Sequence, residues 1–387
     1  MIERLSKLSL IIFLSVLINP SLLFSQQNYQ DWLKDQQNDL QAFNFSQNNY
    51  NTDTTRAYQN YIDQQKLEFQ NYKNQIEQKW DTFRGNTKNR YVDYDKDLNA
   101  RGSVDFENGE IEIEVLMEDD LKSKEEDQNK LISKKLENKI NQIVSIKTNS
   151  NQTLLENQLE NKNGEKVTSK NVKRYSEEIV KNKPIKKKVI KSKDGKVRIK
   201  YALTISLLPE HLQIRVRRYK DDVINESKRF KIDPAMVLAI MHTESSFNPK
   251  AESPVPAYGL MQLVPKTGAR DAYLYVYNKD KLLTANYLFN PKNNIELGCA
   301  YLKKIRSVYF KDIKNDLSAT YCMIAAYNTG PGNLAKAFTG NKKLSPAIRE
   351  INALSPNEVY LKLVNDLTHK ESRSYLKKVT SRIEYYK

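Results

Sequence analysis

Two residue types that often carry chemistry are scarce in this sequence of 387 residues: cysteine occurs twice and histidine three times. The histidines, His211, His242 and His369, lack the spacing of metal ligands, so we expect neither a metal site nor another cofactor. Cys299 and Cys322 lie in apolar helical contexts, which indicates buried small side chains, with a mutual disulfide as the alternative.

A good membrane span is also missing from the N-terminal region. Arg4 and Lys7, an apolar stretch over 8–18 and small residues near Ser25 are typical of a secretory signal over residues 1–25. The apolar stretch is short and broken at Asn19-Pro20, although an uncleaved anchor remains the alternative. No cysteine lies near its end to carry a lipid. We therefore predict export to the periplasm without a lipidated cysteine.

The charge is strongly unbalanced, with a net charge of +16 and a sequence pI near 9.4. In a cytosolic protein this would suggest nucleic acid, but the export signal and the lack of a nucleic-acid motif argue against that partner. An anionic polymer of the cell envelope suits the charge better. The simplest interpretation is that most lysines lie on solvated faces.

The first part of the chain reads as a leader followed by a small α+β domain. Residues 26–85 are rich in Gln, Asn and Tyr, and an apolar stripe from Tyr58 onward predicts an amphipathic helix that docks on the next domain. Contact of this stripe with a membrane or another protein is the alternative. In residues 86–207, Asn108-Gly109 and Asp194-Gly195 predict two hairpins with two-residue turns. Between them we expect helical segments and a mobile middle around 149–164.

Residues 209–387 show helical patterning and no clear strand, which predicts an all-α domain. One helix there is expected to be buried, because Asp233 and Pro234 suit a helix N-terminus and Met236–Met241 is an unbroken apolar run. Glu244 follows at the C-terminal end. Apolar neighbours and the negative end of the helix dipole should raise its pKa, as a general acid requires. On position alone, a solvated glutamate without function is the more common outcome.

Three short motifs give Glu244 its context. They are Glu244–Pro249 (ESSFNP), Gly259–Gln262 (GLMQ) and Ala326–Gly332 (AYNTGPG), in this order. Together they resemble the catalytic core of the soluble-lytic-transglycosylase family, and the hairpin around residue 108 is similar to the N-terminal domain of a membrane-bound branch of that family. The resemblance implies a lysozyme-like catalytic domain over 209–387 that cuts peptidoglycan glycan strands.

The resemblance also assigns roles to single residues. Glu244 would be the catalytic acid and base. The substrate-binding residues would be Ser253, Gln262, Tyr327, Asn328 and Tyr375. Two positions depart from the family pattern: Val264 stands where a methionine is common, and Pro256 replaces a glycine.

The implied reaction is non-hydrolytic. Glu244 would protonate the leaving GlcNAc oxygen, and the 6-hydroxyl of MurNAc would attack its own anomeric carbon to give a 1,6-anhydroMurNAc end. A held hydroxyl reaches effective molarities of ~10⁵–10⁸ M in well-oriented cases, which water cannot match. No second carboxylate is fixed by spacing, and Glu252, Asp271 and Glu296 are candidates for structural roles only.

Alternatives remain for both the residues and the protein. Ser253 and Asn328 could cap helices, and Tyr327 and Tyr375 could belong to the core. A lysozyme-like or chitinase-like hydrolase would share the fold and the acid, and a non-catalytic wall-binding protein would share the fold alone. We expect a monomer whose N-terminal domain contacts the cell wall or a membrane surface.

Overall fold

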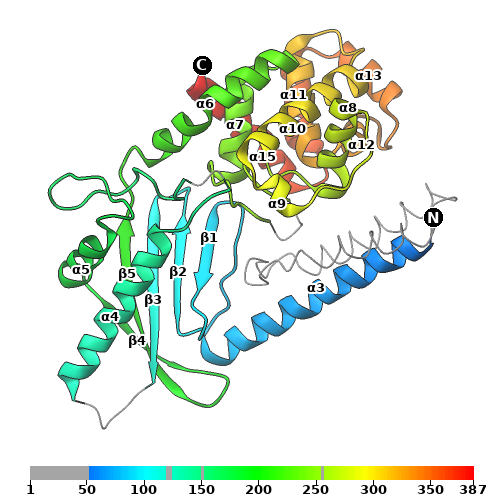
Figure 1. The fold of residues 1–387 in the computed structure, drawn as a ribbon. Coiled ribbons are helices and arrows are strands. Elements are labelled where there is room, and N and C mark those ends of the chain that lie inside the picture. The colour runs from blue at the N-terminus through cyan, green and yellow to red at the C-terminus, as the bar shows by residue number, and fades with distance from the viewer. Residues whose placement is uncertain (1–51, 119–123, 150–151, 254–256) are drawn as a thin grey trace, which may run out of the picture.

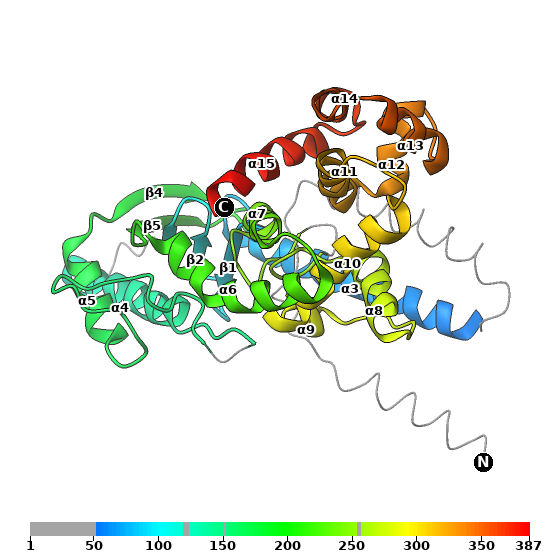
Figure 2. The same ribbon diagram turned by 90° about the horizontal axis from the view of Figure 1, so that it is seen from above.

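The computed structural model describes residues 52–118, 124–149, 152–253 and 257–387. The predicted signal over 1–25, the first half of the leader and Pro256 lie outside these residues. The chain combines an antiparallel sheet flanked by helices with a C-terminal bundle of helices, shown side by side in Figures 1 and 2. The predicted α+β class with an all-α C-terminal domain is confirmed.

The N-terminal part is a five-stranded sheet in the order β1-β2-β3-β5-β4, with every neighbouring pair antiparallel. Its elements are α3 (Thr52–Lys79), β1 (Arg90–Tyr94), β2 (Ala100–Asp105), β3 (Glu110–Glu118), α4 (Glu125–Val144), α5 (Val172–Asn182), β4 (Lys186–Lys191) and β5 (Val197–Ser206). Helix α4 covers one face of the sheet, where Leu136 and Ile140 pack against Ile113. The sheet therefore has one apolar face under α4 and α5.

The other face of the sheet is covered by the C-terminal end of α3 (Figure 1). Ile76 and Trp80 are fully buried against Val92 and Leu116, and the Trp80 indole donates a hydrogen bond to the Leu98 carbonyl at 2.8 Å. The predicted amphipathic helix is thus present, and the end of its stripe docks on the sheet.

Both predicted hairpins are present, but both turns are longer than the expected two residues. Lys191 pairs with Val197 across β4 and β5, so five residues, 192–196, connect those strands. Asp105 and Glu110 are paired across β2 and β3, so four residues, 106–109, connect the strands instead of two. The Asp105 carboxylate accepts hydrogen bonds from the backbone N–H groups of Glu107 and Asn108 at 3.1 and 3.0 Å. This bonding stabilises the wider turn, and Gly109 takes the positive φ of 70° at its end.

The segment predicted to be a mobile middle is packed where the structure describes it. Leu154, Leu155 and Leu159 are buried against the sheet domain, and Gln158 is inaccessible to solvent. The prediction of a mobile segment was wrong. It followed from the asparagine-rich composition of the segment and gave too little weight to three leucines that pack in one core.

The regular elements of the C-terminal part are all helices among the described residues, with isolated β-bridges from Tyr258 to Glu252 and Leu263 in a loop. Its α-helices are α6 (His211–Phe230), α7 (Pro234–Ser245), α8 (Arg270–Tyr277), α9 (Ala285–Leu288), α10 (Pro291–Lys304), α11 (Asp316–Thr329), α12 (Pro331–Thr339), α13 (Leu344–Ala353), α14 (Pro356–Asp366) and α15 (Lys370–Tyr386), with single π-turns at Pro265–Ala269 and Ile305–Tyr309. Cys299 and Cys322 are buried and not bonded to each other. Within the described part of the chain, no helix is both long and apolar enough to pass through a bilayer.

Helix α7 packs in the bundle in contact with α6 and α15. Asp233 caps its N-terminus by accepting a hydrogen bond from the Ala235 N–H at 2.9 Å, with Pro234 in the first turn. Every residue from Ala235 to Met241 is buried. The expected buried helix is confirmed, and it presents Glu244 in its last turn.

Candidate active site

The candidate site forms around Glu244, whose side chain is enclosed by the bundle. The residue is 7% exposed, and burial raises the pKa of its carboxyl to about 7. Lys88 and the Tyr375 hydroxyl oppose this rise, and Glu371 adds to it. The carboxyl therefore remains protonated up to near-neutral pH, in the direction expected from its apolar surroundings.

Two tyrosines share the buried space with this carboxyl. The negative charge of Glu244 contributes to a raised pKa for both Tyr327 and Tyr375, after the larger effect of burial. The Tyr327 hydroxyl donates to the Met261 carbonyl at 2.7 Å. The Tyr375 hydroxyl is near enough to Glu244 to affect its pKa, yet it forms no hydrogen bond of ordinary length with any described residue. A buried hydroxyl of this kind beside a protonated acid is a group that a bound ligand could satisfy.

The second motif lies against the end of α7. The Ser245 hydroxyl is 2.7 Å from the Leu260 carbonyl, which joins the helix to the turn that ends in Gln262. The Gln262 amide nitrogen donates to the carbonyls of Ala251 and Gly259 at 3.0 and 3.1 Å. Its Oε1 is buried without a partner in the described part of the chain, so this oxygen can accept a hydrogen bond from a ligand.

The structure brings together Glu244, Tyr327 and Tyr375, and Gln262 follows Met261, whose carbonyl accepts from Tyr327. Two other predicted residues are less well placed. Ser253 is half-buried, and its backbone N–H donates to the Ala257 carbonyl at 3.2 Å. Asn328 is half-buried beside Tyr327, and its side chain forms no hydrogen bond with a residue that the structure describes. Val264, one of the two positions that depart from the family pattern, directly precedes the π-turn at Pro265–Ala269 and is half-buried.

One residue that supports the site was not predicted from the sequence. Asn294, on α10, is inaccessible to solvent and holds the turn that carries Gln262. Its side-chain oxygen accepts from the Met261 N–H at 2.8 Å, and its nitrogen lies 2.8 Å from the carbonyls of Tyr258 and Leu288. The sequence signal for this role was an asparagine next to the apolar Ile295 within a helix. An asparagine that is buried in such a helix needs hydrogen-bond partners.

The N-terminal part also reaches the site. Lys88, just before β1, pairs with Glu371 in the first turn of α15 at 3.6 Å. The buried amide of Asn86 hydrogen-bonds to Glu252, whose pKa is raised well above its usual range by burial. Nothing in the sequence linked these pairs, since their members lie far apart along the chain.

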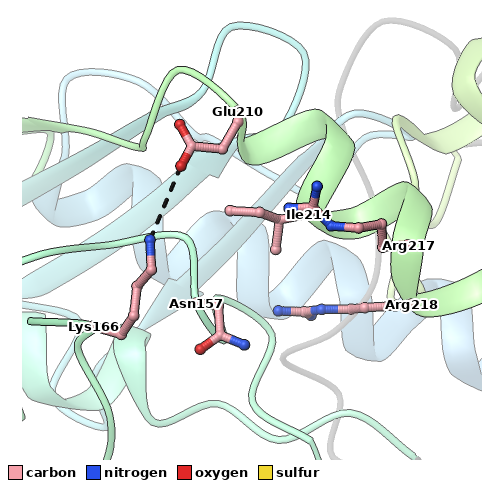
Figure 3. A pocket seen from close by; sticks show the side chains of 6 residues that line it. All are labelled: Asn157, Lys166, Glu210, Ile214, Arg217 and Arg218. Atoms are coloured by element: carbon pink, nitrogen blue, oxygen red, sulfur yellow. Dashed lines mark ion pairs between the residues drawn. The ribbon is translucent and has the colours of Figure 1, made fainter.

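A separate hollow on the surface lies away from the acid (Figure 3). Its lining residues are Asn157, Lys166, Glu210, Ile214, Arg217 and Arg218. The Arg218 guanidinium already donates to the carbonyls of Thr153 and Leu154, both at 3.3 Å, and Lys166 lies 4.0 Å from Glu210. Since two of its cations have partners and no expected site residue lines it, this hollow is not the candidate active site.

Comparison with known proteins bears on both parts of the chain. Residues 221–349 match the family described as "Transglycosylase SLT domain". Residues 41–218 match "Membrane-bound lytic murein transglycosylase C, N-terminal domain", which includes α3 as well as the sheet. The resemblance predicted from the three motifs and the first hairpin is confirmed.

Individual relatives agree with these matches. The chain is 39% identical to membrane-bound lytic murein transglycosylase C of Klebsiella pneumoniae and 40% identical to that of Cronobacter sakazakii, each over 198 residues. The match covers 51% of this chain and 54% of each relative, so the chain spans about half the length of the curated relatives it matches. A solved structure, the 70-kDa soluble lytic transglycosylase of Escherichia coli, is 26% identical over 43% of this chain and 24% of that one, with a TM-score of 0.33.

Proposed function

We propose, from the SLT transglycosylase domain that this chain carries, that it is a lytic transglycosylase which cleaves the β-1,4 bond between MurNAc and GlcNAc in peptidoglycan. The observation that carries the proposal is the buried Glu244 carboxyl, whose pKa of about 7 keeps a proton available at neutral pH. The relatives supply the substrate class, and the site supplies the acid.

In the proposed mechanism, Glu244 first donates its proton to the glycosidic oxygen, and the bond to GlcNAc breaks. The 6-hydroxyl oxygen of MurNAc then bonds to the anomeric carbon of the same sugar, and its proton passes to the Glu244 carboxylate. The acid is thereby restored, and the product carries a 1,6-anhydro ring without consuming water. One carboxyl suffices, because the nucleophile belongs to the substrate and is already held in place.

The other site residues would orient the sugar. Gln262 Oε1 is buried without a hydrogen-bond partner among the described residues, so it is available to sugar hydroxyl or acetamido groups. The Tyr375 hydroxyl lies beside the Glu244 carboxyl and could contact the same sugar. The Tyr327 hydroxyl is held by its hydrogen bond to the Met261 carbonyl, and Tyr327 would help to position Glu244. Ser253 and Asn328 belong to the same proposal through the family resemblance alone.

The products decide between this reaction and hydrolysis. Peptidoglycan digested with the protein should yield fragments with 1,6-anhydroMurNAc ends, each lighter by one water than a reducing end, as measured by mass spectrometry. Reducing MurNAc ends would instead identify a lysozyme-like hydrolase. Intact glycan strands that nevertheless bind the protein would identify a wall-binding protein.

The cellular setting follows from the substrate. We propose an exported, periplasmic and monomeric protein that meets glycan strands through its C-terminal part, with the N-terminal part beside the wall or a membrane surface. Cell fractionation tests the location. Recovery of the intact precursor in the cytosol would contradict this part of the proposal.

The pH dependence of cleavage gives a further prediction. Because Glu244 must carry a proton to act as the acid, kcat/KM should fall as the pH rises through about 7. Replacing Lys88 with methionine removes a cation that stabilises the Glu244 carboxylate, so this fall should move to higher pH. Replacing Glu371 with glutamine removes a neighbouring negative charge, so the fall should move to lower pH.

These two substitutions control for each other, since both break the same ion pair at 3.6 Å. A general effect of losing the pair would move both pH profiles in the same direction. Profiles of kcat/KM measured across neutral pH distinguish shifts in opposite directions from shifts in the same direction. Shifts of both variants in the same direction would contradict the assignment of the titrating group to Glu244.

A further inference from the structure

The polypeptide that follows the acid has an unusual backbone. Ser246 and Phe247, two and three residues after Glu244, have positive φ angles of 48° and 59°. Both are L-residues with side chains, for which this left-handed region is unfavourable, and such conformations persist only where the surroundings impose them. The end of the catalytic helix therefore depends on its contacts.

The most direct of these contacts comes from the N-terminal domain. Glu107 lies in the turn between β2 and β3 and accepts a hydrogen bond from the Ser246 hydroxyl. The other oxygen of the same carboxylate pairs with Arg382 of α15, which in turn donates to the Thr243 hydroxyl at 3.2 Å. One carboxylate is thus linked to residues on both sides of Glu244.

A buried arginine joins the same two parts of the chain. Arg215 is 1% exposed; its Nε donates to the Ser246 carbonyl at 2.9 Å, and its Nη2 donates to the Phe106 carbonyl at 2.7 Å. Its Nη1 donates to Gln158 Oε1 at 2.5 Å. The guanidinium therefore fastens the turn of the sheet domain to the strained end of α7.

The turn itself is rigid enough to transmit position. The Asp105 carboxylate accepts from two N–H groups of the turn, and the Gly109 N–H bonds to the Asp105 carbonyl at 2.9 Å. At Gly109 a Cβ atom would lie 2.5 Å from the His211 ring, so the turn also fits closely against the start of α6.

We propose that Glu107 is a positioning residue for Glu244, so that the sheet domain forms a working part of the active site. This rests on the proposed function of Glu244. The contacts act on Thr243 and Ser246, which flank the acid, and none of them involves the proposed sugar-binding residues Gln262 and Tyr375. Their loss should therefore lower the rate of the chemical step and leave substrate binding little changed, because small misplacements of a reacting group are costly to the rate.

The test compares Glu107→Ala with Glu110→Ala in the full chain. Glu110 is an exposed glutamate in the same hairpin, at the start of β3, and it serves as the matched control. On soluble glycan chains of peptidoglycan we expect Glu107→Ala to lower kcat by roughly 10- to 100-fold, with KM changed by less than about twofold. Glu110→Ala should behave as wild type.

A second readout does not depend on the reaction. Amide hydrogen exchange over residues 243–248 should become faster in Glu107→Ala and stay unchanged in Glu110→Ala, because the left-handed end of α7 loses its support. Glu107→Gln keeps an acceptor for the Ser246 hydroxyl and loses the charge that pairs with Arg382, so it should fall between wild type and Glu107→Ala. If Glu107→Ala does not fold, Glu107→Gln is judged by the same two readouts.

Several results would overturn the proposal. An unchanged kcat, a change in KM alone, or unchanged exchange over 243–248 would each show that Glu107 does not position the acid. If wild-type digests lacked anhydro ends, the proposed function would fail, yet the exchange measurement would still decide whether the turn holds the end of α7.

Discussion

Glutamine in place of Glu244 should nearly abolish peptidoglycan cleavage and leave the fold intact. The amide keeps the shape of the side chain but cannot deliver a proton to the glycosidic oxygen or accept one from the 6-hydroxyl. Positioned proton transfer typically contributes about 10²–10⁴-fold to a rate, and here both transfers pass through one group. Release of anhydro ends per unit time, measured by mass spectrometry, checks the result.

The stability of this variant has an expected sign. An acid with an unfolded pKa near 4.5 and a folded pKa of about 7 stays protonated in the folded state while the unfolded state loses its proton. The free energy of unfolding of the wild-type protein should therefore fall as the pH rises from about 4.5 to 7. The fall is about 1.4 kcal/mol for each pH unit between the unfolded and the folded pKa of Glu244. Glu244→Gln removes this loss.

Thermal melts at several pH values test that reasoning. The variant should melt no earlier than wild type, and its advantage should grow as the pH rises to about 7. Full cleavage activity in Glu244→Gln would remove the residue from the mechanism. A variant that melts earlier than wild type only above neutral pH would show that the carboxyl stabilises the fold in its charged form.

Helix α7, which carries Glu244, could be predicted from the sequence because its determinants are local. An N-cap aspartate, a proline in the first turn and an unbroken apolar run define α7 and its burial, and the raised pKa of Glu244 follows from that burial. The helical patterning of residues 209–387 likewise lies within each segment, and helices such as α6 and α15 form there.

The parts that could not be predicted depend on contacts between distant residues. Glu107 and Ser246 are 139 positions apart, and no period or motif relates them. The turn at Asn108-Gly109 looked like a two-residue hairpin, because the hydrogen bonds that the Asp105 carboxylate makes within it are set by geometry and leave no trace in composition. The sequence thus indicated the buried position of Glu244, while the structure shows the contacts that distant residues make beside it.

The support of the second motif leads to the prediction with the next largest effect. We expect Asn294→Ala to lower the free energy of unfolding by roughly 2–5 kcal/mol. The substitution removes the Asn294 partner of two buried backbone groups, the Met261 N–H and the Leu288 carbonyl, and a buried orphan typically costs about 1–3 kcal/mol. The Tyr258 carbonyl also loses Asn294 but keeps its hydrogen bond from the Leu263 N–H at 3.1 Å. Cleavage should also slow, because this side chain fixes the turn that presents Gln262.

The neighbouring Asn293→Ala is the matched control for this prediction. Asn293 is half-buried on the same helix, and its side chain donates one hydrogen bond, to the Tyr287 carbonyl at 3.2 Å. Thermal or chemical denaturation should separate the two variants by several degrees, since about 1 kcal/mol shifts the melting temperature of a domain of this size by roughly 2–4 °C. The turn has little room to move towards Leu288, because the backbone there is closely packed. A Cβ atom added at Gly259 would lie 2.4 Å from the Leu288 carbonyl oxygen. Equal melting temperatures would show that the GLMQ turn is held by its own bonds and that Asn294 is an ordinary core residue.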